Sequence, residues 1–100
     1  MKNRILLLMM ASGLIATAQF DKSSCPANLS IFAEFAKVKN YDSAYQPWLE
    51  VRNNCPELNV ATFIYGERIL NHKIKKATDD KAALQASLMS LYDDWLTYFP

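Results

Sequence analysis

The chain has 100 residues, which allows one domain at most. Its eleven Lys and Arg residues against ten Asp and Glu residues give a formal net charge of +1. Because nucleic-acid binding requires a concentrated basic surface, this balance argues against nucleic acid as a partner.

The first eighteen residues are predicted to be a signal peptide. Lys2 and Arg4 precede the apolar run 5–15, and Ala16-Thr17-Ala18 supplies the small-x-small pattern that a signal peptidase accepts. A membrane anchor is the alternative, but this run would rise only about 16 Å as a helix, roughly half a bilayer core. We therefore expect cleavage after Ala18, no stable membrane span afterwards, and a periplasmic or secreted protein of a bacterial envelope.

The spacing of apolar residues predicts an all-α domain over residues 19–100, because no run of strictly alternating β-branched residues occurs. The first helix is expected from Ala27 to Val38, with Pro26 in its first turn. Its inward side is expected to carry Ile31, Phe32, Phe35, Ala36 and Val38.

The second helix is expected from Tyr41 to Asn54, after a break at Lys39-Asn40. Asn40 tolerates left-handed backbone and also caps a following helix. The apolar stripe of this helix consists of Tyr41, Ala44, Trp48, Val51 and Cys55. Pro56 then interrupts the helix and opens the next one.

The third helix is expected from Glu57 to Lys76 and the fourth from Asp80 to Tyr98, capped by Thr78-Asp79-Asp80. The third is expected to turn Ala61, Ile64, Tyr65, Ile69 and Ile74 to one side. The fourth has a stripe of Leu84, Leu88, Leu91 or Tyr92, Trp95 and Phe99. Because connections of two to four residues join antiparallel neighbours, the domain is expected to be two antiparallel helical hairpins.

The two hairpins repeat each other. Ala44-x3-Trp48 is followed eight residues later by Pro56, as Leu88-x3-Tyr92 is by Pro100. In the first helix of each hairpin, Ile31-Phe32-x2-Phe35 corresponds to Tyr65-Gly66-x2-Ile69 at an offset of thirty-four residues.

This pattern resembles the tetratricopeptide repeat, abbreviated TPR, in its degenerate exported bacterial form. The large, aromatic, small and proline positions of the first unit carry Ile31, Phe35, Tyr41, Ala44, Trp48 and Pro56. Asn28 and Phe32 depart from the Trp and Gly of the family pattern, Leu88 departs from its small residue, and the second unit is ten residues longer. The resemblance implies stacked repeats over residues 24–56 and 57–100, as the start of a longer array or with a carboxyl-terminal face that binds another chain.

By the same resemblance, the domain is a protein-interaction scaffold whose first helices form a groove for a peptide or a partner helix. The implied contact residues are Ala33, Lys37, Phe63, Glu67 and Asn71, with an exposed Phe63 as the anchor. A helical protein that binds a small ligand or a glycan is the alternative, with Trp48, Trp95 and the tyrosines as stacking platforms.

The two cysteines left after export, Cys25 and Cys55, are predicted to form a disulfide. An even count in an exported chain favours this, and an antiparallel first hairpin places the start of its first helix beside the end of its second. A reduced Cys55 in the core is the alternative.

The sequence carries no pattern that predicts catalysis, a metal or a cofactor, so we expect no enzyme and no cofactor. His72 is the only histidine, and it has no Ser or Cys nucleophile with an orienting carboxylate. Two cysteines and one distant histidine lack the spacing of zinc ligands. The pairs Asp79-Asp80 and Asp93-Asp94 do not converge on one ion, because adjacent residues diverge by about 100° on a helix.

Overall fold

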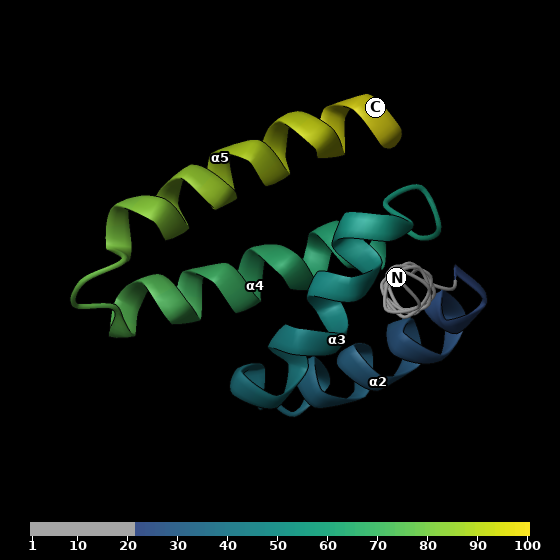
Figure 1. Ribbon diagram of the computed structural model, residues 1–100, viewed down its shortest axis with the longest axis horizontal. Helices are drawn as coiled ribbons and strands as arrows, with labels where there is room; N and C mark the ends of the chain where they lie inside the picture. The colour runs from purple at the N-terminus through teal and green to yellow at the C-terminus, as the bar shows by residue number, and fades with distance from the viewer. Residues whose placement is uncertain (1–21) are drawn as a thin grey trace, which may run out of the picture.

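A computed structural model describes residues 22–100; the predicted signal peptide lies outside this range. A short 3-10 turn, η1 (Lys22–Ser24), leads into α2 (Cys25–Lys37), α3 (Tyr41–Asn54), α4 (Ala61–Lys76) and α5 (Lys81–Tyr98). No strand occurs between residues 22 and 100. The predicted all-α fold is confirmed, and α4 lies between α5 and the α2–α3 pair (Figure 1).

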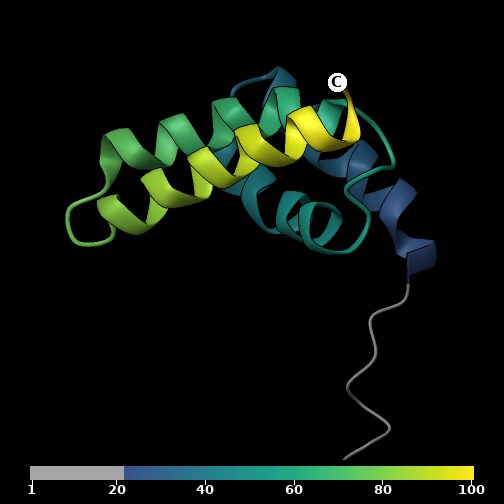
Figure 2. The ribbon, with the colours of Figure 1, turned by 90° about the horizontal axis from the view of Figure 1, so that it is seen from above.

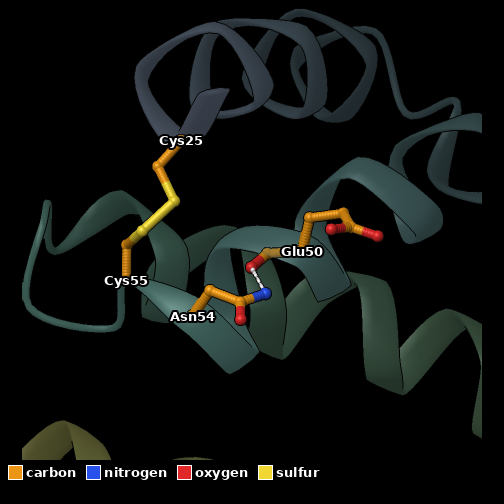
Figure 3. Close-up of a disulfide and its surroundings, with 4 residues drawn as sticks. All are labelled: Cys25, Glu50, Asn54 and Cys55. Atoms are coloured by element: carbon orange, nitrogen blue, oxygen red, sulfur yellow. Dashed lines mark hydrogen bonds between the residues drawn. A yellow bond between two sulfur atoms is a disulfide. The ribbon is translucent and has the colours of Figure 1, made fainter. Parts of the chain in front are cut away.

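The first hairpin, α2 and α3, is closed at its open end by a covalent bond. Cys25, the first residue of α2, forms a disulfide with Cys55, which directly follows α3 (Figure 3). The two Cα atoms are 6.6 Å apart, and both residues are buried in the core. Beside the bridge, the side-chain amide of Asn54 donates a hydrogen bond to the carbonyl of Glu50 at 2.8 Å (Figure 3). The predicted pairing is therefore confirmed, and it requires α2 and α3 to be antiparallel.

The second hairpin, α4 and α5, is held by aromatic packing. The ring of Phe63 near the start of α4 lies within 5.8–6.3 Å, centroid to centroid, of three rings at the end of α5: Trp95, Tyr98 and Phe99. This contact makes α4 and α5 antiparallel, and α5 crosses α4 at a shallow angle when seen from above (Figure 2).

The seam between the two hairpins is built around Trp48. Its indole N–H donates a hydrogen bond to the carbonyl of Thr62 at 2.8 Å, and the ring lies against the backbone of Gly66. Ala44, one turn before Trp48 on the predicted apolar stripe, is fully buried in the core. Trp48 itself is 2% exposed, which confirms its predicted burial.

The start of α3 at Tyr41 matches the prediction, whereas α2 begins at Cys25 rather than Ala27. Lys39, not Asn40, takes the left-handed backbone at φ 64°, while Asn40 caps α3 by accepting a hydrogen bond from the Ser43 N–H at 3.3 Å. The third helix begins at Ala61 rather than Glu57. In the turn before it, the side-chain oxygen of Asn59 accepts a hydrogen bond from the Ala61 N–H at 2.8 Å, and the cap residue Val60 makes no side-chain capping hydrogen bond.

At the start of α5, Asp80 stands in the predicted cap position. It makes no side-chain capping hydrogen bond there. The helix therefore begins where the sequence indicated, without the contact that was expected to hold its first turn.

Several residues predicted to point inward are exposed. Ile31, Phe35 and Val38 of α2 are 45%, 36% and 73% exposed, and Ile64 of α4 is also exposed. Trp95 is half-buried rather than fully buried. Periodicity places apolar residues on one side of a helix, and no described segment covers this side of α2.

Within residues 22–100, no helix is both long enough and apolar enough to cross a membrane.

Candidate protein-interaction surfaces

The predicted groove does not form around Phe63, because that residue is 0% exposed. The prediction of an exposed anchor was wrong, and the physical reason is local: the rings of Trp95, Tyr98 and Phe99 enclose it. The guanidinium carbon of Arg52 also lies over its face, 5.8 Å from the ring centroid. Phe63 is a core residue.

The other predicted contact residues do not share one open surface. Ala33 is half-buried against the core. Lys37 is exposed and pairs with Glu34 at 3.2 Å. Asn71 is exposed, at a shallow depression that Tyr41 of α3 also lines. A role of these residues in binding stays a prediction.

Glu67, the remaining predicted contact residue, joins α4 to α5. The phenol of Tyr92 donates a hydrogen bond of 2.6 Å to the Glu67 carboxylate. That hydrogen bond, with burial and the negative charge of Glu67 adding to it, raises the pKa of the Tyr92 phenol. The carboxylate of Glu67 is therefore engaged within the molecule, and it holds the phenol of Tyr92.

An apolar face is open on α5. We call it the α5 row and define it as Met89, Tyr92, Leu96 and Phe99. Met89 is 56% and Leu96 70% exposed, while Tyr92 and Phe99 are half-buried. With Trp95, three members of the row line a shallow apolar cleft of about 300 Å³. Side chains of this size at three-four spacing suit contact with another helix.

A second apolar face is open on α2. We call it the α2 row and define it as Ile31, Phe35 and Val38, all exposed. The first two, with Ser30 and Glu34, line a shallow depression of about 350 Å³ on this side of the helix.

The offsets of the predicted repeat relate each row to residues of the inner helices. At the forty-four-residue offset, Met89, Tyr92 and Leu96 correspond to Tyr45, Trp48 and Arg52 of α3. All three of those residues contact α4: Tyr45 lies 4.2 Å below the Lys73 ammonium, Trp48 meets Thr62 and Gly66, and Arg52 lies over Phe63. The α5 row is therefore the counterpart of the α3 surface that receives a helix.

The residues of the α2 row correspond to residues of α4. At the thirty-four-residue offset, Ile31, Phe35 and Val38 correspond to Tyr65, Ile69 and His72 of α4. These face the first hairpin: the Tyr65 ring packs edge-on against Phe32, Ile69 is fully buried, and the His72 ring lies 5.2 Å from Tyr41. The α2 row is therefore the counterpart of the side of α4 that faces the first hairpin, although the α4 residues that Tyr45, Trp48 and Arg52 contact are different ones.

Polar groups also gather at two places. His72 lies 3.5 Å from the Asp42 carboxylate, near Arg68 and Lys75 on the same helix. Between α3 and α5, Arg52 pairs with Asp94 at 2.9 Å and reaches Ser90 at 3.5 Å, in an open cleft of about 340 Å³. Within residues 22–100, no group of three or more His, Cys, Asp or Glu side chains is placed to hold a metal ion.

Searches against protein families, curated proteins and solved structures found no match for this chain. No family is shown.

Periodicity alone assigned the α2 row to the core, and it left Met89 and Leu96 of the α5 row outside the predicted stripe without a role. The offsets of the predicted repeat contain a signal for these residues. A residue whose repeat counterpart faces a neighbouring hairpin is expected to face a neighbour as well, and it stays exposed where no neighbour is present. Leu96 illustrates the point, because its counterpart Arg52 contacts α4 while Leu96 has no described neighbour of that kind.

Proposed function

We propose that this protein is an exported protein-interaction module, made of two TPR-like hairpins, whose α5 row binds an amphipathic helix of a partner. The proposal rests on one observation. Met89, Tyr92 and Leu96 of the α5 row occupy the same repeat positions as three α3 residues that contact the helix α4. The binding surface proposed here replaces the groove around Phe63.

The seam between α3 and α4 gives a mechanism for binding. In the seam, a large ring on one helix, Trp48, is accommodated by a small residue on the other, Gly66. On α5, Tyr92 has the place of Trp48 and is oriented by Glu67. We expect a bound helix to run antiparallel to α5, with a small residue facing Tyr92 and apolar residues facing Met89 and Leu96.

The disulfide supports the exported part of the proposal. Such bonds form and persist in oxidising compartments, including the bacterial periplasm and the cell exterior. The bond between Cys25 and Cys55 closes the hairpin that precedes the binding face. We propose a periplasmic or secreted location on this ground, together with the signal-peptide pattern of residues 1–18.

The arrangement of the tryptophans favours protein binding over stacking on a small ligand or glycan. Trp48 is buried and its indole N–H is already bonded to the Thr62 carbonyl, so it offers no platform. Trp95 packs on Phe63 with its ring nearly parallel, which uses one of its faces.

The test is affinity capture from the envelope of cells that export the chain. Leu96→Asp and Met89→Asp are compared with Gln46→Asp, a control at an exposed position of α3 outside both rows. The proposal expects a protein that is captured by the wild type and the control to be lost with both row variants, while all four chains keep the same helicity. Equal capture by all four would contradict it.

A further inference from the structure

We propose that the helix bound by the α5 row is a basic one, an amphipathic helix with Lys or Arg on both sides of its apolar stripe. This inference rests on the proposed function and names the chemistry of the partner at the same face. It follows from the carboxylates that border the row and from the cations that α5 lacks.

Carboxylates lie along both edges of the row. On the edge toward α4, the Glu67 carboxylate accepts the hydrogen bond from Tyr92 at 2.6 Å. Asp93 lies on the opposite edge, because successive residues of a helix are about 100° apart. Met89 and Leu96 fall between these two edges. A partner helix seated on them therefore places its flanking side chains beside a carboxylate on either side.

Both carboxylates can receive a partner's cation. Asp93 is exposed, and within residues 22–100 its carboxylate makes no ion pair. Glu67 is half-buried and accepts the hydrogen bond from Tyr92, whereas an ionised carboxylate has about four acceptor positions. Asp94 differs from both, because it is already paired with Arg52 at 2.9 Å on the side facing α3.

The chain supplies no cation of its own to this face. Residues 82–100 contain no Lys, Arg or His. The last turns of α2, α3 and α4 each contain a basic residue, and the last turn of α5 contains none, so the negative end of its dipole lacks a compensating cation there. The guanidinium of Arg68, next to Glu67 in sequence, lies over the ring of Tyr65, which packs against Phe32 of α2. The face therefore attracts a basic helix and repels an acidic one.

The expected orientation of the partner adds to this preference. A helix that runs antiparallel to α5 brings its amino-terminal turn, the positive end of its dipole, to the carboxyl-terminal turn of α5. The partner is thus defined by three features: a small residue in the middle of an apolar stripe, large apolar residues on either side of it along the stripe, and Lys or Arg on both flanks.

Two synthetic helical peptides test the charge of the partner. They share an apolar stripe of Leu with a central Ala, and they differ only at the flanking positions, which carry Lys in the basic peptide and Glu in the acidic one. Each is titrated into the exported, disulfide-bonded chain labelled with carbon-13 at the methionine methyl group. Met89 is the only methionine after residue 10, so its signal reports contact with the α5 row and gives the affinity.

The basic peptide is expected to shift the Met89 signal and to bind about tenfold more tightly than the acidic one at low salt, because the acidic peptide replaces two exposed ion pairs with two repulsions. The ratio should shrink as added salt screens these charges. Leu96→Ser should weaken both peptides, since it removes apolar contact without adding a charge.

Charge reversal at the edge of the row identifies the residue that reads the partner. Asp93→Lys should weaken the basic peptide and strengthen the acidic one, and Asp93→Asn should give an intermediate ratio. Glu34→Lys makes the same charge change at an exposed position of α2, and it should keep the preference of the wild type. A preference that Asp93→Lys leaves unchanged would overturn the assignment.

The other outcomes separate this inference from the proposed function. If both peptides shift the Met89 signal with equal affinity, or the acidic one binds more tightly, the basic partner is overturned and the α5 row remains a helix-binding face. If neither peptide shifts the signal, the basic partner is also overturned, and the affinity capture described above decides independently whether the row binds another protein.

Discussion

The indole ring of Trp48 fills the space that a side chain on Gly66 would need. A β-carbon built at Gly66 would lie 2.7 Å from Nε1 of Trp48 and less than 3 Å from two further ring carbons. The neighbouring hydrogen bond from the indole N–H to Thr62 prevents the ring from moving away freely. The contact joins the two hairpins, so its tightness fixes their relative position.

Gly66→Ala is therefore expected to destabilise the protein by about 1–3 kcal/mol, through overpacking. Helix propensity alone predicts the opposite sign, a gain of about 1 kcal/mol. Urea unfolding followed by circular dichroism measures the difference, with Asn71→Ala on the exposed side of α4 as the control. Adding Trp48→Phe should recover part of the Gly66→Ala loss, because the two sites are in contact. A Gly66→Ala variant as stable as the wild type would show that the seam is looser than described.

Phe63→Ala is expected to cost about 3–5 kcal/mol of unfolding free energy, because it empties the centre of the aromatic cluster that closes α4 against α5. Phe35→Ala, at a partly exposed ring of α2, should cost about 1 kcal/mol or less. Thermal or urea unfolding of the two variants separates a core residue from a surface residue. Equal losses would mean that Phe63 is not the residue that holds the second hairpin together.

The hydrogen bond between Tyr92 and Glu67 predicts a dependence of stability on alkaline pH. The bond raises the pKa of Tyr92 in the folded state, so folding favours the protonated phenol. The stabilisation is therefore complete below the pKa of an unfolded tyrosine, about 10, and is lost as the pH rises through the higher pKa of the folded state. The free energy of unfolding should fall more steeply above about pH 10 in the wild type than in Tyr92→Phe. Parallel curves for the two proteins would argue against this bond in solution.

Removal of the disulfide is expected to lower stability substantially. The bond joins residues separated by 30 positions. Loop-closure entropy for a loop of about this length corresponds to about 3.7 kcal/mol, and strain in the native state reduces the measured value. The Cys25→Ala, Cys55→Ala double variant should show the loss in urea unfolding under oxidising conditions, while the wild type should show it only after reduction. A loss below about 1 kcal/mol would mean that helix packing alone holds the first hairpin.

How far the sequence predicted the fold can be judged from particular residues. The bounds of α3 followed from Asn40 and from Pro56, because a cap and a missing N–H act locally. The start of α4 did not, since Pro56-Glu57 also suits a first turn and only the folded chain shows the turn in which Asn59 accepts from the Ala61 N–H. The local sequence allows more than one start for α4, and the folded chain shows which of them is used.

The candidate site was harder to predict than the fold. Phe63 was assigned to a surface because its position in the repeat suggested one, but the aromatic end of α5 covers it. The exposure of Ile31 and Leu96 depends on whether another hairpin stands beside them, and periodicity within one helix contains no information on that. A comparison of positions related by the predicted repeat supplies this information. Where one of two such residues contacts a neighbouring helix and the other is exposed, the exposed one lacks that neighbour.

The central claim, that the α5 row is the binding face, is tested most directly by site-specific photo-crosslinking in cells that export the chain. A photoreactive phenylalanine derivative is placed at Leu96 and, as a matched exposed control, at Gln46. The account predicts discrete adducts of higher mass from position 96 and none from position 46. Adducts from position 46 alone, or from both positions equally, would contradict it.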